Sequence, residues 1–261
     1  MLPEFDLSGR VAIVTGGGSG IGRATALLLA ERGADVAIVG RRIEKLEKTA
    51  AEIRALGRKA LCVTADVRQA DQAGPLVEQV VAAFGRIDIL VNNAGGAHGH
   101  VSLARMDPAK WDRDVQLNLS AAMYVSQAAL PHLKASKGNV VNVSSLAGVH
   151  GTKGVAAYSA AKSGVQMLTR VAASEWGPLG IRVNCVAPGM TATEAAREGW
   201  EKSGFDALAA CKVFPLRRYG ETREVAQMIV FFASDAASYI TGETVAVGGG
   251  PQLGGMIETD E

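Results

Sequence analysis

Short, almost wholly apolar runs alternate with longer helical patterns along nearly the entire sequence. Seven runs predict β-strands, at residues 11–15, 36–39, 60–64, 87–91, 139–143, 181–186 and 244–247. Apolar residues at helical spacing predict helices at about 21–32, 43–56, 69–84, 108–136, 155–176 and 223–233. Strands that are apolar throughout are buried on both faces, which is typical of a parallel sheet. We therefore predict a doubly wound α/β fold, with a central parallel sheet of about seven strands and helices on both faces.

One domain over residues 1–261 is the expected organisation, because no linker, low-complexity stretch or internal repeat divides the sequence. The least regular stretch, residues 190–218, follows the sixth predicted strand. Ligands of open α/β sheets bind beyond the carboxyl ends of the strands. A long segment that leaves such an end is therefore a candidate lid over a substrate pocket. The acidic ending at residues 258–261 is expected to be a solvated tail.

Charge and composition argue against nucleic acid and membrane partners. Lys and Arg total 27 and Asp and Glu total 26, so the formal net charge is +1, and aromatic residues make up 5%. We therefore expect neither attraction to polyanions nor a stacking surface for bases. No apolar run approaches the roughly 20 residues that span a bilayer, and we see no signal peptide. Cys62, Cys185 and Cys211 are few and widely spaced, which fits a reducing compartment and a cytoplasmic protein.

A glycine-rich loop, Thr15-Gly-Gly-Gly-Ser-Gly-Ile-Gly22, joins the first predicted strand to the first predicted helix. Glycines permit a tight turn and close approach to a phosphate, and the helix N-terminus offers free N–H groups and a positive dipole end. In this context the loop predicts dinucleotide binding, although its spacing differs from the usual G-x-G-x-x-G. The alternative is a purely structural turn between strand and helix.

The order and spacing of six motifs resemble the classical short-chain dehydrogenase/reductase family. The glycine loop matches T-G-x-x-x-G-x-G, and Asn92-Asn-Ala-Gly95 follows the fourth predicted strand. Tyr158-Ser-Ala-Ala-Lys162 matches Y-x-x-x-K, with Ser145 thirteen residues before the tyrosine, and Asn118 lies in an Asn-Leu-Ser context. Pro188-Gly189 followed by Thr193 matches P-G-x-x-x-T. The matches extend from about residue 8 to residue 250, so the resemblance implies a Rossmann-type domain over nearly the whole chain.

Tyr158 and Lys162 are four residues apart on one predicted helix, so they share a face. We expect the ammonium to lower the pKa of the tyrosine from its ordinary value near 10, which would make it an acid/base near neutrality. The resemblance implies that Tyr158 is the acid/base, that Lys162 tunes it and binds the nicotinamide ribose, and that Ser145 polarises the substrate oxygen. It further implies that Asn118 holds a water in a proton relay. The alternative for Tyr158 and Lys162 is an ordinary exposed pair without a catalytic role. Ser144 is the alternative to Ser145, but the motif spacing favours Ser145.

Residues at the end of the second predicted strand indicate whether the cofactor is NADP or NAD. Gly40 stands where the family usually carries an acid that selects NAD, and Arg41 and Arg42 follow. Arginine suits a phosphate, so we favour NADP, with NAD as the alternative. Many NADP-using relatives carry a basic residue where this loop has Ser19, which counts against NADP. The two arginines could instead be solvated residues that face acids of the following helix.

The resemblance implies further nucleotide contacts. They are Gly16, Ser19, Gly20, Ile21, Gly22, Arg41, Arg42, Asp66, Val67, Asn93, Ala94, Gly95, Tyr158, Lys162, Pro188, Gly189 and Thr193. Asp66 is the expected partner of the adenine amino group. We expect no metal, because His98, His100 and His150 have no carboxylate partner at a recognised spacing.

Small residues recur every four positions beside the catalytic pair, at Ala156, Ala160 and Gly164. They permit close approach of another helix, or simply internal packing. The family forms dimers and tetramers through this helix, so the resemblance implies a homo-oligomer, with dimer or tetramer left open.

The expected function is an oxidoreductase that transfers a hydride between NADP(H) and a small-molecule secondary alcohol, ketone or related carbonyl compound. Three alternatives stay open: an NAD-dependent alcohol dehydrogenase of the same family, a reductase of enoyl or dienoyl thioesters, and a cofactor-binding sensor without turnover. The substrate is open as well. Trp200, Phe205 and Phe214 in the lid segment mildly favour an apolar one.

Overall fold

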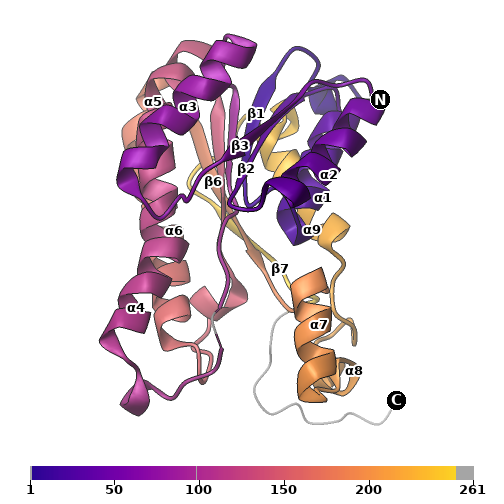
Figure 1. The fold of residues 1–261 in the computed structure, drawn as a ribbon, viewed down its shortest axis with the longest axis vertical. Helices are drawn as coiled ribbons and strands as arrows, with labels where there is room; N and C mark the ends of the chain where they lie inside the picture. Colours follow the sequence, from indigo (N-terminus) through magenta and orange to yellow (C-terminus); the bar gives the residue numbers. More distant parts are fainter. Residues whose placement is uncertain (1, 98, 251–261) are drawn as a thin grey trace.

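The computed structural model describes residues 2–97 and 99–250. His98 and the expected tail at residues 258–261 lie outside the described residues. The described chain forms a single domain in which a central sheet lies between two helical layers (Figure 1). Within these ranges, no helix is both long and apolar enough to cross a membrane.

The central sheet has seven strands, all parallel, in the order β3-β2-β1-β4-β5-β6-β7. Their bounds are β1 Val11–Thr15, β2 Asp35–Gly40, β3 Ala60–Thr64, β4 Ile89–Asn92, β5 Asn139–Val143, β6 Arg182–Pro188 and β7 Thr244–Val247. The three central strands β1, β4 and β5 are buried along their whole length, as their apolar sequences predict. The predicted fold class is confirmed. The chain reverses its direction of winding between β1 and β4, which is where ligands bind in such sheets.

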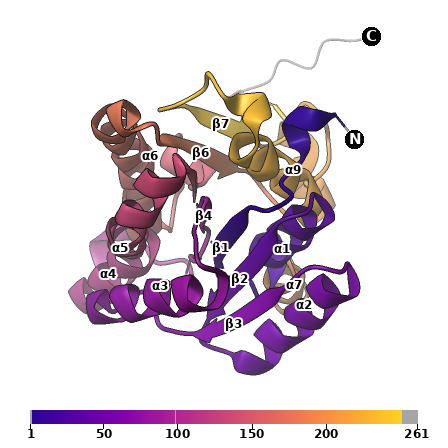
Figure 2. The ribbon, with the colours of Figure 1, turned by 90° about the horizontal axis from the view of Figure 1, so that it is seen from above.

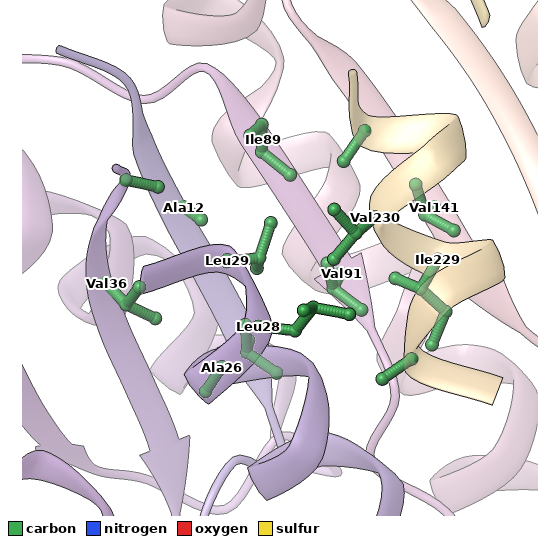
Figure 3. Close-up of a cluster of buried hydrophobic side chains, with 14 of the residues drawn as sticks. Ala12, Ala26, Leu28, Leu29, Val36, Ile89, Val91, Val141, Ile229 and Val230 are labelled. Atoms are coloured by element: carbon green, nitrogen blue, oxygen red, sulfur yellow. The ribbon is translucent and has the colours of Figure 1, made fainter. Parts of the chain in front are cut away.

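Helices cover both faces of the sheet (Figure 2). One layer contains α1 Gly20–Glu31, α2 Ile43–Ala55 and α9 Thr222–Ala233, and the other contains α3 Ala70–Phe84, α5 Ala121–Ser136 and α6 Ala156–Trp176. Successive residues of β1 face opposite layers. Ala12 and Val14 lie in the first core, between the sheet and α1, α2 and α9, and Val11 and Ile13 lie in the second core, on the opposite face. Figure 3 shows the first core, where Leu29 lies among apolar side chains of the sheet and α9.

The predicted helix at 108–136 is not one continuous α-helix. α4 Pro108–Val115 leads into a π-helical turn, Gln116–Ser120, and α5 continues from it. The side chain of Asp107 caps the start by accepting a hydrogen bond from Ala109 N at 3.0 Å. The spacing of apolar residues in the sequence does not reveal such a turn, because the helical axis continues through it. π-Helical turns occur often at functional sites, and this one contains Asn118.

The lid segment at 190–218 is more regular than its sequence predicts. It forms α7 Glu194–Ser203 and α8 Ala207–Ala210. Both helices are capped by a side chain, since Thr193 accepts from Ala196 N at 3.0 Å and Asp206 accepts from Ala209 N at 2.9 Å. Neither helix has a fully buried residue, and each is short with one large apolar residue, Trp200 in α7 and Leu208 in α8, so the sequence gives little apolar pattern to recognise.

Replacement of Leu29 by alanine tests the first core. Leu29 is fully buried, so Leu29→Ala should leave a cavity and lower the free energy of unfolding by about 2–5 kcal/mol in chemical denaturation. Leu56 is 46% exposed, and the matched control Leu56→Ala should cost less than about 1 kcal/mol. Equal losses in the two variants would contradict the assignment of Leu29 to the core.

Candidate functional site

A cavity of about 710 Å³ lies at the carboxyl ends of the strands, beyond β1 to β6. It brings together eighteen of the nineteen predicted site residues: Gly16, Ser19, Gly20, Ile21, Gly22, Arg41, Arg42, Asp66, Val67, Asn93, Ala94, Gly95, Ser145, Tyr158, Lys162, Pro188, Gly189 and Thr193. Asn118 is the exception, because it is buried behind the cavity wall. Residues that are up to 177 positions apart in the sequence therefore share one site, because parallel strands all end at the same edge of the sheet.

The glycine loop forms a cradle that side chains would fill. Gly16 and Gly20 have φ angles of 68° and 55°, a left-handed conformation that favours glycine. A Cβ on Gly22 would overlap the carbonyl oxygen of Gly16 and the side-chain amide of Asn93. The loop delivers the N-terminus of α1 into the cavity, where N–H groups and the helix dipole attract anions. These features fit the phosphates of a dinucleotide.

Thr15 and the Asn93–Ala94 segment lock the glycine loop to the end of β4. The Thr15 hydroxyl accepts hydrogen bonds from the backbone N–H groups of Asn93 and Ala94, each at 3.0 Å. In return, Asn93 Nδ2 donates to the carbonyl oxygen of Thr15 at 2.8 Å. In this structure Asn93 therefore holds two loops together.

Helix α6 places Tyr158 and Lys162 on the cavity wall. The Lys162 side chain is buried, and its Nζ donates a hydrogen bond to the carbonyl oxygen of Val143 at 2.8 Å. Burial disfavours the ammonium and lowers the pKa of Lys162 to about 8. The Nζ lies 5.7 Å from the centre of the Tyr158 ring.

The expected lowering of the tyrosine pKa by Lys162 is wrong for this structure. Burial raises the pKa of Tyr158, and a hydrogen bond with the Ser145 side chain opposes this only in part. Desolvation, which the four-residue spacing to Lys162 does not convey, is therefore the dominant cause of the shift in the Tyr158 pKa. Tyr158 is kept as a neutral phenol, which is a proton donor.

Asn118 is buried beside Lys162 at the π-helical turn. Its Oδ1 accepts a hydrogen bond from Gly96 N at 2.9 Å, and its Nδ2 donates to the carbonyl oxygens of Gly96 and Asp114, each at 3.0 Å. A Cβ on Gly95 would lie 2.7 Å from Asn118 Oδ1 and 3.0 Å from Lys162 Nζ. Glycine at position 95 therefore lets the amide and the ammonium approach the same point.

The two neighbouring serines differ in their contacts. The Ser144 hydroxyl donates to the carbonyl oxygen of Lys162 at 2.7 Å and accepts from Gln166 Nε2 at 3.0 Å, so it ties the end of β5 to α6. The Ser145 hydroxyl accepts from Ala147 N at 3.1 Å and lies beside Tyr158. The geometry thus favours Ser145, as the motif spacing does.

Basic residues gather at the end of the cavity formed by β2 and β3. Arg41 and Arg42 are exposed at the start of α2. Arg68 holds the Asp66 carboxylate through its Nε, which lies 2.9 and 3.0 Å from the two oxygens. These bonds, with a smaller contribution from Arg41, lower the pKa of Asp66. Glu47, one of the acids that could have faced the two arginines, instead accepts a hydrogen bond from Arg54 at 3.2 Å.

The aromatic residues of the lid do not line the cavity. Trp200 and Phe205 line a separate groove of about 450 Å³, and Phe214 is buried. The Trp200 ring packs against Tyr219, with 5.4 Å between the ring centres. In this arrangement these side chains anchor the lid and give no support for an apolar substrate.

Sequence reasoning missed Glu194, which lines the cavity. Its Oε2 accepts a hydrogen bond from the backbone N–H of Gly20 at 2.8 Å. An acid directly after Thr193, which caps α7, is the only signal that could have pointed to it. His100 and His150 do not line the cavity, and in residues 2–97 and 99–250 no cluster of His, Cys, Asp and Glu could hold a metal ion.

Comparison with known proteins agrees with this geometry. Residues 16–252 match the family model described as enoyl-(acyl carrier protein) reductase. The chain is 40% identical to the 3-oxoacyl-(acyl-carrier-protein) reductase FabG of Thermotoga maritima over 94% of this chain and 98% of the relative. It is 43% identical to the cis-4-hydroxycyclohexanecarboxylate dehydrogenase of Sinomonas cyclohexanicum over 92% of this chain and 96% of the relative.

A solved structure gives the same result. The short-chain type dehydrogenase/reductase from Mycobacterium ulcerans superimposes with a TM-score of 0.88 at 36% identity, over 94% of this chain and 90% of that chain. Identity and coverage at this level show the family as well as the fold. The chain belongs to the classical short-chain dehydrogenase/reductase family.

Proposed function

We propose that the protein uses NADP(H) to interconvert a secondary alcohol and a ketone or a related carbonyl compound. The observation that carries the proposal is one cavity that holds both an anion-binding glycine loop and the Ser145–Tyr158–Lys162 group. A bound nicotinamide dinucleotide would supply the hydride. The glycine loop, Arg41 and Lys162 would hold this nucleotide. All four residues expected for catalysis are present, which argues against a sensor without turnover.

Tyr158 and Ser145 are the groups that act on the substrate oxygen in this proposal. In reduction, the Tyr158 hydroxyl donates its proton to the oxygen, and the Ser145 hydroxyl stabilises the developing charge by a hydrogen bond. A phenol carries its proton at neutral pH, as this donor role requires, and the raised pKa of Tyr158 makes it a weaker acid than an exposed tyrosine. In this proposal Lys162, whose Nζ lies 5.7 Å from the centre of the tyrosine ring, and Asn118, which lies beside Lys162, take part in returning a proton to Tyr158.

The preference for NADP rests on charge. Gly40 provides no carboxylate for a ribose hydroxyl, and the neighbouring Arg41 and Arg42 offer planar donors to a 2′-phosphate. Asp66 is the acid close to Arg41, and Arg68 largely neutralises it. NAD is the alternative, because Ser19 supplies no second positive charge from the glycine loop.

The names of the relatives support the reaction class more than a substrate. One is named as a reductase of 3-oxoacyl groups and another as a dehydrogenase of a hydroxylated ring acid, so both names describe carbonyl and alcohol chemistry. The description of the family model favours a second candidate, reduction of an enoyl thioester. A substrate with a conjugated double bond and no free ketone distinguishes the two.

A homo-oligomer is part of the proposal. Met123 on α5 and Met167 and Val171 on α6 are large apolar residues that are at least 40% exposed, which suits a surface covered by a second copy. Gly164 has another role, because a Cβ there would lie 2.9 Å from Leu119, so its smallness serves internal packing. A cytoplasmic location remains a proposal as well, supported by three cysteines that form no disulfide.

Removal of the Tyr158 hydroxyl tests the assignment of the acid/base. Tyr158→Phe keeps the ring but removes the proton, so turnover should fall by about 10²- to 10⁴-fold. The Kd for the nucleotide, measured by fluorescence titration, should stay within about threefold, a shift below 1 kcal/mol. Tyr239→Phe, at a fully exposed tyrosine, is the control and should behave as the unaltered protein. Retained activity in Tyr158→Phe would exclude this role.

A titration with NADPH and, separately, NADH tests the cofactor. NADPH should bind more tightly, and Arg41→Ala should weaken NADPH by about tenfold or more while NADH changes little, since only the phosphate contact is lost. Arg113→Ala, an exposed arginine on α4, is the matched control. A preference for NADH would overturn NADP, and binding of neither nucleotide would overturn the proposed function.

The buried ammonium of Lys162 should reduce stability at neutral pH. Its pKa is about 8 in the folded chain against 10.5 ordinarily, so the unfolded chain binds more protons between these values. Lys162→Met should therefore raise the free energy of unfolding by about 1–3 kcal/mol at pH 7, and the gain should fade as the pH rises from 8 to 10.5. Denaturation across this range checks it, with the exposed Lys153→Met as control. A variant that is no more stable at pH 7 contradicts the cost assigned to burial.

A further inference from the structure

The lid contacts the anion-binding end of the cavity directly. Glu194 is the first residue of α7 and Gly20 is the first residue of α1, and the Glu194 carboxylate accepts the Gly20 N–H at 2.8 Å. Thr193 lies against the same spot, since a Cβ on Gly20 would be 3.2 Å from Thr193 Cγ2. Residues 174 positions apart thus meet at the glycine loop.

A carboxylate in this position resembles a ligand phosphate in charge and in its acceptor oxygens. The N–H groups at the start of α1 have no partners within the helix, and the helix dipole favours a negative charge there. A dinucleotide that lies in the cavity would present its pyrophosphate to the same donors. The carboxylate and the pyrophosphate cannot both occupy the Gly20 N–H.

We propose that Glu194 is an internal competitor for the nucleotide phosphates. It holds the Gly20 N–H when no nucleotide is bound, and it must leave when the pyrophosphate arrives. Its charge then lies close to a second negative group, which weakens the complex further. This inference rests on the proposed function, because it assumes a dinucleotide in the cavity. Glu194 thereby lowers nucleotide affinity and links the position of the lid to the exchange of nucleotide.

The attachment of α7 suits a segment that moves when the nucleotide binds. The helix has no fully buried residue, and its aromatic contact is the packing of Trp200 against Tyr219, which lies directly after the lid segment. Its described polar contacts with the rest of the chain include the Glu194–Gly20 hydrogen bond and a pair between Arg197 and Glu221 at 2.9 Å. Displacement of Glu194 removes one of these few contacts and exposes little apolar surface.

The test compares Glu194→Gln and Glu194→Ala with the unaltered protein. Kd is measured by fluorescence for NADPH and NADH and by calorimetry for 2′-AMP, which has no 5′-phosphate to reach Gly20. Both variants should bind the preferred dinucleotide about three- to tenfold more tightly. The Kd for 2′-AMP should stay unchanged. If NADH is the preferred dinucleotide, adenosine replaces 2′-AMP as the fragment, and its Kd should stay unchanged. Glu201→Gln changes the same charge on the same helix outside the cavity and should leave every Kd as it was.

Each other outcome overturns the inference. An unchanged or weaker dinucleotide Kd in both Glu194 variants means that the carboxylate does not compete. An equal gain in affinity in Glu201→Gln, or for the fragment without a 5′-phosphate, means that the overall negative charge of α7 lowers nucleotide affinity. The contact between Glu194 and Gly20 is then not the cause. Dinucleotide binding by the unaltered protein separates these failures from failure of the proposed function, since a protein that binds neither dinucleotide overturns both.

Discussion

The parallel hydrogen bonding of seven strands is the constraint on which the site depends. Because every strand runs in the same direction, their carboxyl ends meet at one edge of the sheet, where the glycine loop, the Asn93–Gly95 segment, Ser145 and Pro188 all emerge. A buried polar chain ties the central strands together below this edge. Asn92 Nδ2 donates to Ser126 and to Asn142 Oδ1 at 2.8 and 2.9 Å, and Asn142 Nδ2 donates to Thr169 at 2.9 Å. These bonds hold β4, β5, α5 and α6 together, so the helix that carries Tyr158 is placed by the same strands that shape the cavity.

Some features of the site lower the stability of the folded chain. A lysine ammonium is buried, and a π-helical turn replaces regular helix at Asn118. Each feature is unfavourable by itself and persists because the surrounding sheet and helices determine it. The lid is built differently, from capped helices with no buried residue. The residues proposed for catalysis therefore lie on elements that pack into the core, whereas α7, which also lines the cavity, has no fully buried residue.

Most of the fold and much of the candidate site could be predicted from the sequence. Apolar runs indicated the strands, and the spacing of glycine, serine, tyrosine and lysine indicated the residues that line the cavity. What the sequence did not show was the surroundings of individual side chains in the folded chain. The sign of the Tyr158 pKa shift depends on burial by distant segments, which the four-residue spacing to Lys162 cannot convey. α7 was missed because it is short and carries a single large apolar residue, Trp200, so its apolar pattern is too brief to recognise. The aromatic residues of the lid mildly favoured an apolar substrate, yet Trp200 packs against Tyr219 outside the cavity.

The sequence by itself determined the alternation of strands and helices and the presence of a glycine loop between the first strand and the first helix. These follow from short-range rules, namely the period of apolar residues and the steric freedom of glycine. Only the tertiary structure decided the direction of the Tyr158 pKa shift, the exclusion of Trp200 and Phe205 from the cavity, and the contact between Glu194 and Gly20. Such features depend on which residues meet in space, and their energies depend on burial and distance, which exist only after the sheet has brought the strand ends together.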